Sequence, residues 1–271
     1  MSSIGSFLFC GDSFLEEGSF PHLAVDRGFR YGMSVFETFA LREGRLSDAD
    51  AHLHRLVEAA SQLFHYELSV EVVRPALERL GSSLSFDGVL RLYLTAGPGG
   101  PLAEVSAPAL VALAEAASFP TLEEIQAGWS VALERAPFSP YGQGFKTGNY
   151  WANIRAMHFA RGQGCQEALL FNPGGNIVSC SMGNVFLVVD GILKTPRLED
   201  GARRGVVREW VLTQATCEEC AVDISDIYRA TECFVTNSRI GVMPVSSLDG
   251  RILPDRTQAL HLNHLRRALD A

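Results

Sequence analysis

Apolar residues in the first quarter of the chain form one short stretch typical of a strand and one run with helical spacing. The stretch "VFETFAL" at 35–41 is rich in β-branched and aromatic residues, and "REGR" at 42–45 follows it as a turn, so together they predict a β-hairpin. From 53 to 64 apolar residues recur at three- and four-residue steps, which predicts a helix. Ser47 and Asp50 resemble a capping box and indicate where that helix begins.

The rest of the pattern mixes short strands with helices. A second helix is expected over 69–80, with Gly81 as its stop and Pro75 producing a kink or a later start. The opening residues predict a strand, a turn and a strand. Further elements follow from the same patterns: helices near 149–161, 205–215 and 258–269, and strands at "VLRLYLTAG", "ALVALAEA", "WSVALER", "EALLFN", "VFLVVDG", "ILKTP" and "CFVTNS".

The segment "ASFPTL" at 117–122 is the best candidate for a linker between domains. On both sides of it strands and helices are mixed without regular βαβ alternation, which favours an α+β fold over a doubly wound sheet or a TIM barrel. A length of 271 residues fits one large domain or two ordinary ones. We therefore expect two domains, residues 1–118 and 119–271.

The composition and net charge of the chain argue against several classes of binding partner. Apolar residues make up 47 % and charged residues 20 % of the chain, as in a soluble globular protein, and the net charge is −8. Nucleic acid is not an expected partner because no lysine- and arginine-rich run occurs. A membrane is not expected either, because no apolar run reaches about 18 residues. The opening "MSSIGSFLFC" lacks the basic region of a signal peptide, so the six cysteines are expected to be reduced thiols in the cytoplasm.

No metal site is expected from the cysteines and histidines. Cys217 and Cys220 form one CxxC, but a structural zinc site needs four ligands, and neither a second CxxC nor a nearby histidine pair completes it. His52 and His54 would point to different faces of a helix.

Lysine is scarce in this chain, which singles out one position. Of the 23 basic residues 21 are arginine, and only Lys146 and Lys194 are lysine. A lysine can lose its proton when desolvated and form a Schiff base with a carbonyl, whereas arginine stays protonated. Lys146 lies in "SPYGQGFKTGNYWAN", where glycines, aromatic and polar residues mix as in the lining of a pocket. Lys194 follows the Asp190–Gly191 turn, where an exposed strand lysine is the natural interpretation.

Several stretches resemble, in order and spacing, the class IV pyridoxal-phosphate aminotransferases, the fold type IV enzymes. They are "DRGFRYGMSVFET", "HLHRL", "KTGNY", "NVFLVVDGILKTPRL", "GVVREWVL" and "FVTNSRIGVMPV", and they span nearly the whole chain. The resemblance implies a small α/β N-terminal domain, a larger pseudo-barrel C-terminal domain carrying the cofactor lysine, pyridoxal 5'-phosphate as cofactor, and a homodimer. The family includes branched-chain aminotransferase, D-amino-acid aminotransferase and aminodeoxychorismate lyase.

The resemblance also implies residue roles for cofactor binding. Lys146 is similar to the lysine that holds the cofactor as a Schiff base. Arg55 matches the arginine that binds the cofactor phosphate, and a guanidinium fork suits a phosphate; the alternative is a solvent-facing helix arginine. Val206 and Val207 match a pair whose backbone N–H groups begin a helix at the phosphate. Ser238 matches a second phosphate contact.

Further roles concern the pyridine ring and the substrate. Tyr150 matches a position near the ring. Phe29, Arg30 and Tyr31 fall where relatives have substrate-facing groups.

Two departures from the family pattern affect the expected chemistry. Ser179 stands where relatives have a glutamate that pairs with the pyridine nitrogen, five residues before Asn184. Ala96 stands where many relatives have an arginine that holds the substrate carboxylate. A serine hydroxyl does not keep the nitrogen protonated as a carboxylate does.

Three functions stay open within this resemblance. The departure at Ser179 favours elimination, as in aminodeoxychorismate lyase, which gives 4-aminobenzoate and pyruvate. The alternative is transamination between an amino acid and a 2-oxo acid, of the D-amino-acid or branched-chain type. A third is a repurposed family member with little catalysis.

Overall fold

The structure is a computed structural model that describes residues 4–10, 12–16, 23–139 and 144–270. It divides into two compact units, one of Met1–Phe119 with Phe145–Asn149 and one of Pro120–Gly144 with Tyr150–Ala271. This division differs from the predicted domains in the segment that contains Lys146. Phe145–Asn149 groups with the first unit because the Phe36 N–H donates to the Lys146 carbonyl at 2.8 Å, and the Gly148 N–H donates to the Ser34 carbonyl at 2.8 Å.

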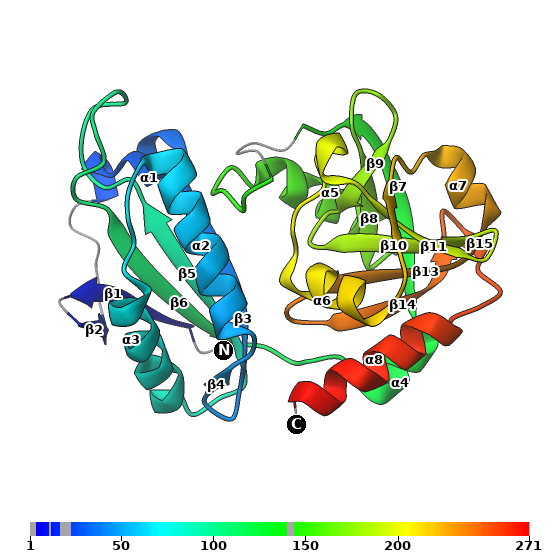
Figure 1. The fold of residues 1–271 in the computed structure, drawn as a ribbon, viewed down its shortest axis with the longest axis horizontal. Helices are drawn as coiled ribbons and strands as arrows, with labels where there is room; N and C mark the ends of the chain where they lie inside the picture. Colours follow the sequence, from blue (N-terminus) through cyan, green and yellow to red (C-terminus); the bar gives the residue numbers. More distant parts are fainter. Residues whose placement is uncertain (1–3, 11, 17–22, 140–143, 271) are drawn as a thin grey trace. The chain divides into compact units, whose positions relative to one another are not determined.

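The first unit is one sheet covered by two long helices (Figure 1). The strands pair in the order β2-β1-β6-β5-β3-β4, all antiparallel. Leu53, Leu56 and Ala60 of the first long helix are buried, as their helical spacing predicts. The elements are β1 (Ile4–Cys10), β2 (Ser13–Glu16), α1 (Arg27–Tyr31), β3 (Ser34–Arg42), β4 (Arg45–Leu46), α2 (Ala49–Phe64), α3 (Val70–Ser83), β5 (Gly88–Thr95) and β6 (Ala109–Ala116).

The second unit is built around a larger, curled sheet. Its elements are α4 (Leu122–Ala127), β7 (Trp129–Pro137), α5 (Trp151–Gly162), β8 (Glu167–Phe171), β9 (Ile177–Cys180), β10 (Asn184–Val189), β11 (Ile192–Pro196), α6 (Val206–Gln214), β12 (Glu218–Cys220), α7 (Ile224–Arg229), β13 (Ala230–Asn237), β14 (Gly241–Leu248), β15 (Arg251–Ile252) and α8 (Thr257–Asp270). The strand order is β12-β11-β10-β13-β14-β7-β8-β9, with β15 beside β14. The last strand, β9, also packs beside β10, so the sheet curls into a partial barrel.

The strands of the second sheet carry apolar side chains on both faces. All five residues of β8 and all four of β9 are buried. One face packs in a cluster that includes Val131, Leu169 and Val185. On another, Phe186 and Phe234 stack with 4.8 Å between ring centres, beneath α6 and α8. Strands buried on both faces read as continuous apolar runs, which is the pattern of "VFLVV".

The predicted elements are present, but two predicted helix boundaries are wrong. α2 follows Asp48, which has a φ of 54° and makes no side-chain capping bond, so Ser47 and Asp50 do not form a capping box. α3 runs through Gly81 to Ser83. Glycine is required at 81 for another reason: a Cβ there would lie 2.9 Å from the carbonyl oxygen of Gly44. Pro75 lies inside α3, so the helix does not start late.

Within the described residues no helix combines the length and the apolarity that crossing a bilayer requires.

Candidate active site

Lys146 lies in a short extended segment alongside the start of β3. Thr147 forms a bridge with Val35, next to the backbone hydrogen bond between Lys146 and Phe36. The Lys146 Nζ lies 4.2 Å from the centre of the Phe36 ring, within cation–π range. Phe36 in turn stacks on Tyr93 of β5 with 5.0 Å between ring centres. Backbone pairing and an aromatic wall therefore hold the amine in place.

Arg55 on α2 is bound by a buried carboxylate of β3. Its Nε donates to Glu37 Oε1 at 2.7 Å and its Nη2 donates to Oε2, so the ion pair is bidentate. His52, three residues earlier on α2, lies with its Nδ1 2.7 Å from Glu37 Oε2. The side chain of Arg55 is only 13 % exposed. This excludes the alternative of an arginine that faces solvent.

The charge of Glu37 persists at physiological pH despite its burial. Burial acts to raise the pKa of this carboxyl, but the Arg55 charge and the hydrogen bonds from His52 and Arg55 outweigh it. They lower the pKa to about 2. A permanently ionised Glu37 fixes the plane of the Arg55 guanidinium, so Glu37 is a positioning residue for Arg55.

The three predicted substrate-facing residues lie on the short helix α1. Phe29 is 66 % exposed and Tyr31 42 % exposed, unusually high for aromatic side chains. Arg30 Nη1 donates to the carbonyl of Gly99 at 3.3 Å and its guanidinium lies 4.8 Å from the Tyr31 ring centre. This helix therefore contacts the glycine-rich loop that follows β5.

That loop is anchored by a fully buried arginine. Arg27 Nε donates to the Gly97 carbonyl at 3.2 Å, and Nη1 to the Ala103 carbonyl at 2.6 Å. Its Nη2 donates to the carbonyls of Ala96 and Glu104. Ala96 itself is completely buried. At position 96 this chain therefore contributes a carbonyl oxygen to the loop anchor.

In the second unit Tyr150 contacts an arginine that the sequence analysis did not single out. Arg203 Nη1 donates to Tyr150 Oη at 3.4 Å, and the guanidinium lies 5.7 Å from the centre of the Tyr150 ring. Tyr150 is the N-cap of α5. Arg203 lies two residues before Gly205, the N-cap of α6.

Ser179 lies on β9, where it pairs with Leu170 of β8, and it is 9 % exposed. The carboxylate of Glu167, at the start of β8, holds the turn that follows. Its Oε2 accepts hydrogen bonds from the N–H of Ser181 at 2.9 Å and from Ser181 Oγ at 2.6 Å, and its Oε1 accepts from the Met182 N–H at 2.9 Å. Burial raises the pKa of Glu167, and these hydrogen bonds offset part of the increase.

Val206 and Val207 begin α6, as the sequence predicts. The N-cap Gly205 has no side chain to cap the first N–H groups, which suits a helix that binds an anion there. Asn184 fixes this end of the helix, because its Nδ2 donates to the Arg203 carbonyl at 2.8 Å. A Cβ at position 205 would lie 2.0 Å from Asn184 Oδ1, so only glycine fits.

Ser238 lies in the turn between β13 and β14, which Asn237 organises. Asn237 Oδ1 accepts hydrogen bonds from the N–H groups of Arg239 and Ile240, both at 3.0 Å. Its Nδ2 donates to the Met182 carbonyl at 3.2 Å, in the turn that Glu167 holds. Asn184 and Asn237 therefore join the three turns that carry or adjoin predicted cofactor residues in the second unit.

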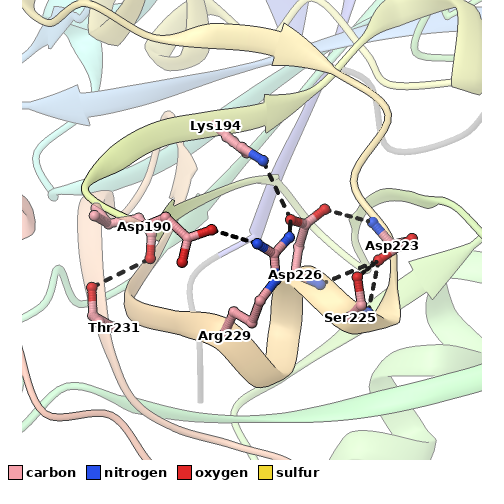
Figure 2. Close-up of polar contacts among 8 residues, drawn as sticks. Asp190, Lys194, Asp223, Ser225, Asp226, Arg229 and Thr231 are labelled. Carbon is pink, nitrogen blue, oxygen red and sulfur yellow. Dashed lines mark hydrogen bonds and ion pairs between the residues drawn. The ribbon is translucent and has the colours of Figure 1, made fainter.

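Lys194 is less exposed than the sequence suggests. On β11 its side chain is 18 % exposed, and its Nζ lies 3.4 Å from Asp226 Oδ1. Figure 2 shows that Arg229 bridges the same Asp226, at 2.8 Å, and Asp190 in the β10–β11 turn. The expectation of an exposed strand lysine is therefore wrong, and Lys194 belongs to a structural ion-pair network.

Burial disfavours the thiolate forms of the two cysteines in the CxxC. Burial raises the pKa of Cys217 to about 12 and also raises the pKa of Cys220. No group of histidine, cysteine and carboxylate side chains suited to a metal occurs in the part of the chain that the structure describes.

Sequence reasoning missed the residues that position others: Glu37, His52, Glu167, Asn184, Arg203 and Asn237. A signal was present for two of them. Glu37 in "VFETFAL" and Glu167 in "EALLFN" are lone acids within apolar strands, which are buried only when partners compensate the charge. The partners themselves come from elements distant in sequence.

Three known proteins illustrate the similarity along the chain. The D-alanine aminotransferase of Listeria monocytogenes is 26 % identical over 238 residues, which cover 83 % of this chain and 81 % of the relative. The solved 4-amino-4-deoxychorismate lyase of Pseudomonas aeruginosa is 26 % identical, with a TM-score of 0.83 and full coverage of both chains. The branched-chain aminotransferase of Thermoproteus uzoniensis, at 24 % identity and a TM-score of 0.83, has the same fold over 98 % of this chain and 94 % of its own.

The family model "Amino-transferase class IV" matches residues 34–248. That range contains Lys146, Arg55 and all the predicted cofactor residues. Members of this family are pyridoxal-phosphate-dependent enzymes, so the predicted family, fold class, enzyme class and cofactor are confirmed. The chain belongs to the class IV aminotransferases, with the fold type IV architecture.

Proposed function

We propose that this enzyme catalyses an elimination on an amino-acid-like substrate, of the kind that aminodeoxychorismate lyase performs, with pyridoxal phosphate bound through Lys146. The observation that carries the proposal is Ser179 together with Glu167. Ser179 offers a neutral hydroxyl, and the nearby carboxylate of Glu167 has both oxygens engaged by Ser181 and Met182. No other acid of the described part of the chain hydrogen-bonds this turn.

The residues of each unit fit a phosphorylated aldehyde cofactor. In the first unit, Lys146 supplies an amine against an aromatic wall and Arg55 a guanidinium held rigid by Glu37. In the second, α6 begins at Gly205, where backbone N–H groups suit a phosphate and no side chain blocks the approach.

The roles of these residues follow from their chemistry. Bound pyridoxal phosphate supplies the electron sink that stabilises negative charge at the substrate Cα. Lys146 Nζ would hold the cofactor and, once freed by the substrate amine, would remove the Cα proton. Arg55, Ser238 and the first N–H groups of α6 bind the phosphate. Tyr150 would contact the ring, and Ser179 Oγ would donate a hydrogen bond to an unprotonated ring nitrogen.

An unprotonated nitrogen weakens the electron sink, and this affects the two reactions unequally. Transamination would depend more on that electron sink, because the substrate loses no leaving group that could carry the negative charge away. Elimination expels a leaving group promptly, and formation of an aromatic ring assists it. The proposal is tested by incubation with aminodeoxychorismate and with a panel of L- and D-amino acids, following cofactor absorbance and products. Release of 4-aminobenzoate together with pyruvate from aminodeoxychorismate supports elimination, and formation of 2-oxo acids from the amino acids alone contradicts it.

Transamination is the second candidate, because the D-alanine aminotransferase relative covers most of the chain. We expect Ser179→Glu to speed half-transamination by about tenfold for each 1.4 kcal/mol by which a carboxylate stabilises the protonated ring. Pyridoxamine phosphate released after denaturation measures this rate. A native enzyme that transaminates at about 1–1,000 s⁻¹ and slows on substitution contradicts the role given to Ser179.

We also propose a homodimer, acting in the cytoplasm on a small amino substrate. The exposed apolar side chains of the first unit support it, since Phe29, Tyr31 and Leu102, which is 98 % exposed, lie on α1 and the loop it contacts. Sedimentation velocity is expected to give a dimer, and Leu102→Asp with Phe29→Ser to weaken it. An active monomer in the wild type contradicts the proposal.

A further inference from the structure

Arg203 carries a charge that the described residues do not neutralise. Among these residues the Arg203 guanidinium contacts the hydroxyl and the ring of Tyr150, and its Nε is buried without a hydrogen-bond partner. No carboxylate lies within ion-pair distance of its guanidinium in the described part of the chain. A guanidinium that is partly desolvated and lacks an anion costs free energy, so such a group is typical of a ligand site.

Three arginines described above differ from Arg203, because each has its charge or its hydrogen bonds met by other groups of the chain. Arg27 is satisfied by loop carbonyls, Arg55 by Glu37, and Arg229 by two aspartates. The backbone of Arg203 is also fixed, because its carbonyl accepts hydrogen bonds from Asn184 Nδ2 and from the Gly205 N–H. Its side chain is therefore presented from a fixed backbone and oriented by Tyr150.

We propose that Arg203, oriented by Tyr150, binds the carboxylate of the amino substrate. The location of Arg203 is consistent with substrate binding. The family resemblance assigns Tyr150 to the cofactor ring, and the Arg203 guanidinium contacts Tyr150 directly. Many relatives hold the substrate carboxylate with an arginine at the position of Ala96. The assignment gives this chain a different arginine for the same carboxylate. It rests on the proposed function, because it requires a cofactor beside Tyr150.

Two probes that differ in one carboxylate test the assignment without knowledge of the natural substrate. Aminooxyacetate and methoxyamine both react with a protein-bound pyridoxal phosphate through the same aminooxy group and change its absorbance. The ratio of their association constants therefore measures carboxylate recognition alone. Cofactor affinity is measured separately, by fluorescence quenching on adding pyridoxal phosphate to the apoprotein.

Arg203→Gln is expected to weaken aminooxyacetate binding about tenfold or more, with methoxyamine binding and cofactor affinity unchanged. Arg203→Lys keeps the charge and should recover part of the loss. Arg229→Gln, which removes an arginine from the network of Figure 2, is the matched control and should leave the ratio unchanged.

Each other outcome overturns the assignment. An equal effect on both probes, or none, shows that Arg203 does not recognise a carboxylate. A weaker cofactor affinity with an unchanged ratio assigns the guanidinium to the cofactor phosphate. A lower melting temperature with an unchanged ratio makes the contact with Tyr150 structural. A wild-type protein that develops no cofactor absorbance at all refutes the proposed function, and the inference with it.

Discussion

Lys146→Ala is expected to lose the covalently bound cofactor completely and to turn over substrate about 10²–10⁴-fold more slowly than the wild type. In the proposed function the amine binds the aldehyde and then accepts the Cα proton, and alanine can do neither. The structure gives the substitution little other effect, because the segment is held by backbone hydrogen bonds between Lys146, Phe36 and their neighbours, which alanine retains.

Borohydride reduction followed by peptide mapping measures the linkage directly. In the wild type the reduced adduct is expected on the peptide that contains Lys146, and in Lys146→Ala no adduct should form. The matched control is Lys194→Ala, which removes the only other lysine and breaks the ion pair with Asp226. It should keep both the adduct and the turnover. An adduct on Lys194 would contradict the assignment.

The second large effect is expected at Glu37. Glu37→Ala leaves the buried Arg55 guanidinium and the buried His52 ring without their shared partner. Removing one member of a buried ion pair typically costs about 3–5 kcal/mol of unfolding free energy, because the other charge stays desolvated and unpaired. Urea denaturation measures the loss, and cofactor affinity should fall with it because Arg55 is no longer oriented.

A surface ion pair provides the control for this substitution. Glu78 pairs with Arg74 on α3, with side chains that are 56 % and 43 % exposed. Glu78→Ala is expected to change the unfolding free energy by less than about 1 kcal/mol. A comparable loss of unfolding free energy in both variants would mean that the buried ion pair of Glu37 stabilises the fold no more than an exposed one.

The lowered pKa of Glu37 predicts that the unfolding free energy decreases at acidic pH. The pKa of Glu37 is lowered from 4.5 to about 2 in the folded chain, so the stabilisation is present above about pH 4.5. It is lost as the pH falls from about 4.5 towards 2, by on the order of 3 kcal/mol in total. Glu37→Gln should therefore flatten the acid limb of the stability profile. An unchanged acid limb would contradict the lowered pKa.

The amino-acid sequence predicts helices and strands well where one local pattern carries the information. The hairpin at 35–45 follows from its β-branched and aromatic residues and its turn, the helix after it follows from helical spacing, and the scarcity of lysine singles out Lys146. The helix ends were harder to predict, because tertiary contacts decide them. Gly81 is a helix stop by its chemistry, yet it lies inside α3 because the Gly44 turn packs against it.

The positioning residues could not be predicted for a related physical reason. Glu167 reads as an acid in a strand, and only the fold reveals that its partners are the N–H groups of Ser181 and Met182. Arg203 reads as one of a pair of arginines before a helix. Its contact with Tyr150 joins residues 53 positions apart, a separation that no local pattern encodes.

The anchoring of the glycine-rich loop has a consequence for varying its side chains. Arg27 holds the loop through main-chain oxygens, which every amino acid supplies. The conformation of the loop therefore constrains few of its side chains: Gly97 must stay, since a Cβ would lie 1.9 Å from the Ala107 carbonyl, but a Cβ at Gly100 meets nothing within 4 Å. Positions 100–102 are thus a natural place for a mutational library, in which side chains vary while the backbone that displays them keeps its shape.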